Sequence, residues 1–304
     1  DLVGRPIAMR TPTGVHEYVY DAAGQVIGFR RLGTNIVYNY DPSGNRTSVR
    51  VNGVTVPYTA NALDQYTRVG DATYTYDADG NLRQVISPQG VYTLEYDSLG
   101  QLYRLTTPDG VYEYDYDALG HRYLVRYNGQ ERYHIHDPVG LGNLVAEYDP
   151  SGNLITRYDH VFGLVSMSNA TGVYYYHTDL IGNIRALTGS GGVIANRYEY
   201  GPFGEPLAVQ EAVPNPFRYI GSDGVMTEPT GLLYMRARYY DPGMGRFTAP
   251  DPLMFLSEFN FYRYAINAPT YAKDPTGLLP DWLDWLKPFR CPRDLQPCPT
   301  EAAP

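Results

Sequence analysis

The side chains of this sequence that could carry chemistry include carboxylates that directly precede a proline. Asp251 and Asp274 both have this context. A following proline disfavours the α region for the residue before it, so each aspartate is held extended and the direction of its carboxylate is restrained. Asp-Pro pairs are also common in turns, so spacing alone favours turns over catalysis. The same dipeptide begins at Asp41, Asp137, Asp149 and Asp241.

Two histidines form a second candidate group. His134 and His136 have the two-residue spacing that places both imidazoles on one face of a strand, and Asp137 follows, which would suit a zinc ion. His136, however, takes the place of a repeated tyrosine described below, and the sequence offers no further ligand cluster. We therefore favour a structural role and expect neither a metal nor a cofactor. The common nucleophile-elbow, phosphate-loop, zinc-protease and EF-hand motifs are absent from the sequence.

A repeat must position these residues. The pattern Tyr-Asp-x-x-Gly recurs, several times at an interval of twenty residues, and variants begin at His136, His177 and Tyr200. The regular copies begin at Tyr20, Tyr40, Tyr76, Tyr96, Tyr116 and Tyr148. Asp at the first turn position can accept hydrogen bonds from backbone N–H groups ahead of it, and Gly at the fourth tolerates positive φ. Each motif is therefore predicted to be a hairpin turn between two short strands.

Tyrosines alternate ahead of these turns, as at Tyr112, Tyr114 and Tyr116, which places their rings on one face of a strand. Such a face could bind a sugar or a base. Because the tyrosines recur at every repeat, we favour cross-strand ladders that fill the sheet. The predicted fold is all-β, a repetitive antiparallel β-hairpin ribbon in which each hairpin is covered by its neighbours.

The composition agrees with an all-β chain: 31 Tyr, 31 Gly and 24 Pro accompany only 19% charged residues. A net charge of −9 without clustered Lys and Arg argues against nucleic-acid binding. The sequence contains no run of about 18 apolar residues, so we expect no membrane span. The two cysteines, Cys291 and Cys298, lie near the end of the chain, where a disulfide and two free thiols both remain open.

The repeats closely resemble the YD repeats of bacterial Rhs proteins, toxin-complex C subunits and animal teneurins, notably in YYHTDLIGN at residues 175–183. A later stretch resembles the Rhs-associated core domain. Its matching strings are TGLLYMRARYYDPGMGRF at residues 230–247, DP at 251–252, NFYRY at 260–264, NAP at 267–269 and DPTGL at 274–278. The resemblance implies a hollow β-cage that the core domain closes at one end, with the segment after the core as cargo.

The resemblance also implies an aspartyl autoprotease that acts on its own chain and cuts after DPTGL, between Leu278 and Leu279. The matching carboxylates are Asp251 and Asp274. Two carboxylates held close together share a proton, so that one activates water while the other protonates the carbonyl group. Arg238 matches the arginine of the family's motif and would orient a carboxylate or stabilise developing negative charge.

We divide the chain into a YD-repeat shell segment (residues 1–214), an Rhs-associated core (215–278) and a C-terminal tail (279–304). The tail includes Trp282 and Trp285, and we expect it to be a short amphipathic helix or irregular. It looks too short for a folded toxin, and nine or so repeats look too few for a full cage. The tail would be a cargo remnant or a plug.

These features favour a secreted or cell-surface bacterial protein that holds and releases C-terminal cargo in bacterial competition or toxin delivery. Its partners would be its own cargo, the rest of a YD-repeat shell, or a secretion or toxin-complex protein. One alternative is a cell-surface adhesion or carbohydrate-binding module. Another is an inert scaffold, because an open sheet leaves edge strands that invite pairing.

Overall fold

The computed structural model describes residues 1–253 and 260–278, and within them 21 strands form one long sheet. These strands are β1 (Ala8–Thr11), β2 (Gly14–Tyr20), β3 (Val26–Arg31), β4 (Thr34–Tyr40), β5 (Arg46–Val51), β6 (Val54–Ala60), β7 (Tyr66–Val69), β8 (Ala72–Tyr76), β9 (Leu82–Ser87), β10 (Gly90–Tyr96), β11 (Leu102–Thr107), β12 (Gly110–Tyr116), β13 (Arg122–Tyr127), β14 (Gln130–His136), β15 (Leu144–Tyr148), β16 (Leu154–His160), β17 (Leu164–Asn169), β18 (Gly172–Thr178), β19 (Ile184–Gly189), β20 (Ile194–Tyr200) and β21 (Pro206–Glu211).

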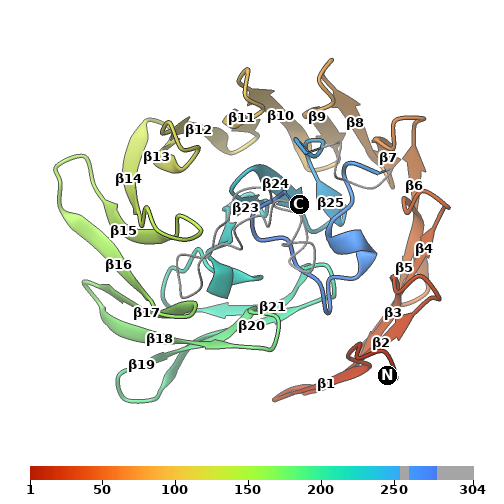
Figure 1. The fold of residues 1–304 in the computed structure, drawn as a ribbon, viewed down its shortest axis with the longest axis horizontal. Coiled ribbons are helices and arrows are strands. Elements are labelled where there is room, and N and C mark those ends of the chain that lie inside the picture. The colour runs from red at the N-terminus through yellow and green to blue at the C-terminus, as the bar shows by residue number, and fades with distance from the viewer. Residues whose placement is uncertain (254–259, 279–304) are drawn as a thin grey trace, which may run out of the picture.

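The long sheet is an up-and-down meander, in which each strand pairs antiparallel with the next strand of the sequence. Its two edges are β1 and β21. The sheet curls into a ring, so that β1 comes round towards β20 and β21 (Figure 1). The prediction of an all-β antiparallel hairpin ribbon is confirmed.

The turn at Asp41 shows why the repeat folds as predicted. The N–H of Gly44 donates to the carbonyl of Asp41 at 3.0 Å, and the N–H of Asn45 donates to the Asp41 carboxylate at 2.9 Å. Gly44 has φ 77°, in the left-handed region that favours glycine. The pairing of β4 with β5 shifts register at Tyr40, directly before the turn. Equivalent bonds recur at Asp77, Asp97, Asp117 and Asp149.

The motif tyrosines also join neighbouring repeats. The hydroxyl of Tyr116 donates to the carbonyl of Leu102 at 2.7 Å. His136, in a tyrosine position, places its Nε2 3.0 Å from the carbonyl of Arg122 and its Nδ1 2.9 Å from that of Gly142. Each imidazole nitrogen thus faces a backbone carbonyl, and the N–H of the neutral ring donates to one of them, in agreement with a structural role for His136. Other tyrosines, among them Tyr38, Tyr66, Tyr114 and Tyr198, are buried and fill the sheet.

The chain after β21 turns into the middle of the ring, where a second sheet forms (Figure 1). Its strands are β22 (Met226–Thr227), β23 (Leu233–Met235), β24 (Arg238–Asp241) and β25 (Arg246–Phe247), accompanied by the 3₁₀ turns η1 (Gly221–Asp223) and η2 (Ala265–Asn267). No α-helix occurs in the residues that the structure describes. The tail at 279–304 lies outside them.

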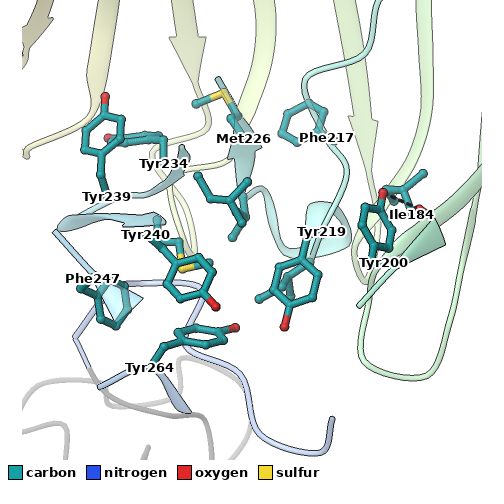
Figure 2. Close-up of a cluster of buried hydrophobic side chains, with 14 of the residues drawn as sticks. Ile184, Tyr200, Phe217, Tyr219, Met226, Tyr234, Tyr239, Tyr240, Phe247 and Tyr264 are labelled. Atoms are coloured by element: carbon teal, nitrogen blue, oxygen red, sulfur yellow. Dashed lines mark hydrogen bonds between the residues drawn. The ribbon is translucent and has the colours of Figure 1, made fainter. Parts of the chain in front are cut away.

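The inner segment and most of the ring share one large hydrophobic cluster, and a smaller cluster lies between β3, β4, β5 and Phe203. Figure 2 shows Tyr219, Tyr240 and Tyr264 of the inner segment together with Ile184 and Tyr200 of the ring. Burial of each such side chain contributes about 1.5–3 kcal/mol. The long sheet ends at Glu211 and the second sheet begins at Met226. The division at 214 and 215, and closure of a longer cage by this segment, stay predictions.

The two ends of the ring meet through side chains, along what we call the seam. Glu199 of β20 forms an ion pair with Arg31 of β3 and accepts a hydrogen bond from Thr13, between β1 and β2. Tyr38 of β4 packs against Phe203, with ring centroids 5.1 Å apart. The repeats thus complete one turn of a ring, which side chains rather than backbone pairing hold together.

The seam should make the fold sensitive to acid. Burial lowers the pKa of His16, in β2, to about 4, and the charge of Arg185 acts in the same direction. Between pH 6.5 and 4 only the unfolded chain carries this proton, so stability falls as the pH falls. Urea unfolding should show that the parent loses about 2.5 kcal/mol more than His16→Phe between pH 7.5 and 4.5. Equal losses in the two proteins would contradict this prediction.

Candidate active site

Three side chains that the resemblance selected meet inside the ring. Arg238, the first residue of β24, places Nη2 3.1 Å from Oδ2 of Asp251 and 3.4 Å from Oδ2 of Asp274. All three side chains are buried. Because one nitrogen contacts both carboxylates, the two Oδ2 atoms lie no more than about 6.5 Å apart. The structure brings the group together, and its catalytic role stays a prediction.

Arg238 is fixed from every side. Its Nε donates to the carbonyl of Gly277, and its Nη1 donates to the carbonyl of Phe261 at 3.0 Å. The guanidinium carbon lies 3.6 Å from the ring centroid of Phe247, a cation–π contact. Burial lowers the pKa of Arg238, and the carboxylates of Asp251 and Asp274 oppose this shift. An arginine keeps its proton in a protein, so the site holds a permanent positive charge.

Asp251 is held by the backbone on both sides. Its N–H donates to the carbonyl of Phe261 at 3.0 Å, and its Oδ1 accepts from the N–H of Leu253 at 2.8 Å. Burial raises the pKa of Asp251, Arg238 lowers it, and Asp274 raises it further. The net shift of the Asp251 pKa is upward, which favours a proton on the carboxyl pair.

Asp274 begins the DPTGL turn and bonds to that turn through one oxygen. Its Oδ1 accepts from the hydroxyl of Thr276 and from the N–H of Leu278, both at 3.1 Å. Its Oδ2 faces Arg238. The Asp274 carboxylate therefore contacts Leu278, the residue that precedes the peptide bond predicted to be cut. Leu279, the other side of the predicted cleavage point, lies outside the described residues.

Gly277 is the residue of this turn that tolerates no side chain. Its φ is +67°, and a Cβ there would lie 2.6 Å from the carbonyl oxygen of Met235 and 3.0 Å from the nitrogen of Arg238. Glycine lets the DPTGL turn lie directly against the start of β24. This close approach allows the Arg238 guanidinium to reach the carbonyl of Gly277.

Sequence reasoning missed two contributors to the site. The first is Arg236, which donates a hydrogen bond to the carbonyl of Pro275. The second is the carbonyl of Phe261, which accepts hydrogen bonds from Nη1 of Arg238 and from the N–H of Asp251. The Arg-x-Arg spacing at 236 and 238 was visible in the sequence. A backbone carbonyl leaves no sequence signal, so the part of Phe261 was not predictable.

Within residues 1–253 and 260–278, His, Cys, Asp and Glu side chains form no group of three or more that could hold a metal ion. Among these residues, too, no helix has the length and apolar character needed to cross a bilayer. Cys291 and Cys298 lie outside the described part of the chain. The arrangement inside the ring is thus two carboxylates and an arginine beside a backbone turn.

The family described as Teneurin YD-shell matches residues 9–270, which include the ring and most of the inner segment. The chain belongs to the teneurin YD-shell family. The match confirms the family that the repeats and the core strings indicated. The YD shell here consists of the meander of hairpins, and the arginine with its two aspartates lies inside it.

Curated relatives of this YD-shell chain include bacterial proteins named as nucleases and toxins. The tRNA3(Ser)-specific nuclease WapA of Bacillus spizizenii is 31% identical over 168 residues, 52% of this chain and 7% of that protein. Toxin protein Tse5 of Pseudomonas aeruginosa is 38% identical over 109 residues, 35% of this chain and 8% of that protein. The YD-shell chain thus matches less than a tenth of the length of either relative.

The fold also resembles part of a solved structure. In the Photorhabdus luminescens Tc holotoxin pore, the TM-score is 0.50 at 19% identity, over 88% of this chain and 18% of that chain. At this identity the likeness concerns the fold alone.

Proposed function

We propose that this chain is the part of a YD shell that encloses C-terminal cargo and cuts itself between Leu278 and Leu279. The observation that carries the proposal is the contact of Arg238 with Asp251, Asp274 and the carbonyl of Gly277. In support, Asp274, one of the two buried carboxylates, accepts a hydrogen bond from the N–H of Leu278, the residue that precedes the proposed cut. Relatives with names such as Toxin protein Tse5 support a role in toxin delivery, from a secreted or cell-surface location.

The charges of the site suit an aspartyl mechanism. With both carboxylates ionised, the buried group of Arg238, Asp251 and Asp274 carries one net negative charge, and with one protonated it is neutral. Burial of unbalanced charge is costly, so the pair should share a proton, as the raised pKa of Asp251 supports. One carboxylate then takes a proton from water while the other protonates the carbonyl oxygen of Leu278.

The subsequent steps need no other group. The water oxygen bonds to the carbonyl carbon of Leu278, and the resulting tetrahedral centre collapses. The bond from that carbon to the nitrogen of Leu279 breaks, the nitrogen takes the shared proton, and a carboxyl end remains at Leu278. Arg238 stabilises whichever carboxylate is ionised at each step, so the two carboxyl groups hold one proton between them.

The interior of the ring has room for a polypeptide. A cavity of about 1210 Å³ is lined by residues of β12–β18, β20 and β21 and by the chain around β22 and β23. Its lining mixes apolar side chains with charged groups such as Arg132, Glu147 and Glu228. A cavity of this size holds a short segment, and enclosure of a whole cargo domain would require the longer shell that the relatives' lengths suggest.

Intact mass of the purified chain beside an Asp274→Asn variant tests the proposal. The parent should separate into two fragments that meet after Leu278, and Asp274→Asn should remain whole, because an amide cannot accept the proton that the mechanism moves. Asp241→Asn, which changes another Asp-Pro pair, is the matched control and should be cut like the parent. An uncut parent at pH 5 and pH 7 would reduce the site to a structural ion pair.

A further inference from the structure

The DPTGL turn is bonded residue by residue to the segment that contains Arg238. Three consecutive carbonyl groups accept bonds from three consecutive residues: Pro275 from Arg236 Nη1 at 2.5 Å, Thr276 from the N–H of Ala237 at 3.1 Å, and Gly277 from Arg238 Nε. Arg238 also contacts both carboxylates. Arg236 instead holds the carbonyl of Pro275, three residues before Leu278, which suits it to position the turn.

The same Arg236 side chain binds the wall of the ring. Its Nε donates to the carbonyl of Leu141 at 2.6 Å, and its Nη2 donates to Oδ1 of Asn143 at 2.9 Å. Nη2 also donates to the carbonyl of Asp223, in η1, at 2.7 Å. Leu141 and Asn143 lie in the turn between β14 and β15. One planar guanidinium thus joins the ring, the inner segment and the DPTGL turn.

The ring turn that receives Arg236 differs from the regular repeat. In the repeat at Asp41, the N–H of the aspartate pairs with the carbonyl four residues later, at Asn45. In this turn, the N–H of Asp137 pairs with the carbonyl of Asn143. The longer turn is the one whose Leu141 and Asn143 groups contact the guanidinium.

Two further observations concern the contact between Arg236, the DPTGL turn and the ring. Arg236 has φ 59°, a left-handed conformation that residues other than glycine seldom adopt, at the first position of the two-residue turn between β23 and β24. Lys273, directly before Asp274, forms an ion pair with Asp223 at 2.6 Å. The start of the DPTGL segment is therefore tied to η1 through Lys273 and to the ring through Arg236.

We infer that Arg236 is a positioning residue that makes self-cleavage conditional on assembly of the ring. The inference rests on the proposed function and specifies its regulation. Until the β14–β15 turn is in place, Arg236 lacks two of its acceptors, and the Pro275–Gly277 carbonyls are not held against Arg238 and its carboxylates. A shell of this kind cuts only after it has closed around the inner segment, which prevents premature loss of whatever follows Leu278.

The rate of self-cleavage tests this inference. The chain is labelled in a short pulse of cell-free synthesis and transferred to buffers between pH 5 and 8, and its cleavage is followed over time. Arg236→Gln should be cut about 10-fold to 100-fold more slowly than the parent, because displacement of a reacting group by a fraction of a bond length has that effect. Its pH profile should keep the parent's midpoint, since Asp251 and Asp274 are unchanged. Arg157→Gln, at an exposed arginine, is the control. A rate within twofold of the parent would overturn the inference.

A glycine pair tests the ring turn without touching the site. Gly142, φ +66°, leaves no room for a Cβ against the His121 ring, whereas Gly152, φ +80°, has nothing within 4 Å of that position. Gly142→Ala should slow cleavage and Gly152→Ala should not. A shift of the pH midpoint in Gly142→Ala or Arg236→Gln would instead indicate a general loosening around Asp251.

Hydrogen exchange separates this inference from the proposed function. In an Asp251→Asn background, which remains whole, Arg236→Gln should remove the amide protection of peptides that cover residues 273–278, and Arg157→Gln should not. If the parent is not cut, the proposed function fails. The exchange result still decides whether Arg236 holds the DPTGL turn in place. Unchanged protection would overturn the positioning role whether or not the chain cuts itself.

Discussion

Arg238→Met should destabilise the fold by about 3–5 kcal/mol and abolish the proposed cleavage. Removal of one partner from a buried ion pair leaves an uncompensated charge, and here two carboxylates, Asp251 and Asp274, would lose their shared cation. The variant would also lose the bonds to the carbonyls of Gly277 and Phe261. Urea unfolding at pH 7, with the intact mass of each sample recorded, measures both effects.

The matched variant removes the remaining charge. Arg238→Met combined with Asp251→Asn and Asp274→Asn should recover most of the lost stability, because the site then buries no net charge, yet it should remain uncut. Arg157→Met, at an exposed surface pair, should change stability by less than about 0.5 kcal/mol. If Arg238→Met were as stable as the parent, the buried charges would have to be hydrated or already protonated.

Phe217→Ala should lower stability by about 3–5 kcal/mol through loss of the contact between the inner segment and the ring. Phe217 is fully buried and meets the ring of Tyr158 edge-on, with centroids 4.9 Å apart. Phe162, in the loop after β16, is fully exposed and provides the matched control. Phe162→Ala should leave the urea midpoint nearly unchanged.

The same pair of variants reports on cooperativity. If the ring and the inner segment share one core, Phe217→Ala should shift a single unfolding transition rather than split it into two. A split transition would show that the two parts unfold separately, and it would support the predicted division at 214 and 215. A change of less than 1 kcal/mol would mean that the cluster relaxes around the missing ring.

The local structure of the ring was predictable because it depends on short-range chemistry. Asp41 and Gly44 form their turn through bonds within five residues, and alternate tyrosines such as Tyr112 and Tyr114 share a face at the period of a strand. His136 was correctly interpreted as a member of the repeat, because its position relative to Asp137 defined its place. Asp251, Asp274 and Arg238 were selected by resemblance, and spacing alone would not have distinguished them from other residues of the same types.

The sequence by itself determined the hairpins, their order and the family of the chain, since each rests on contacts between near neighbours or on a distinctive string of residues. Only the tertiary structure decided that Arg238 lies between the two carboxylates, that Glu199 closes the seam with Arg31, and that Arg236 joins the DPTGL turn to a ring turn about a hundred residues earlier. The physical reason is that such contacts depend on how far the meander curls, a sum of small twists between many strands that no single repeat encodes.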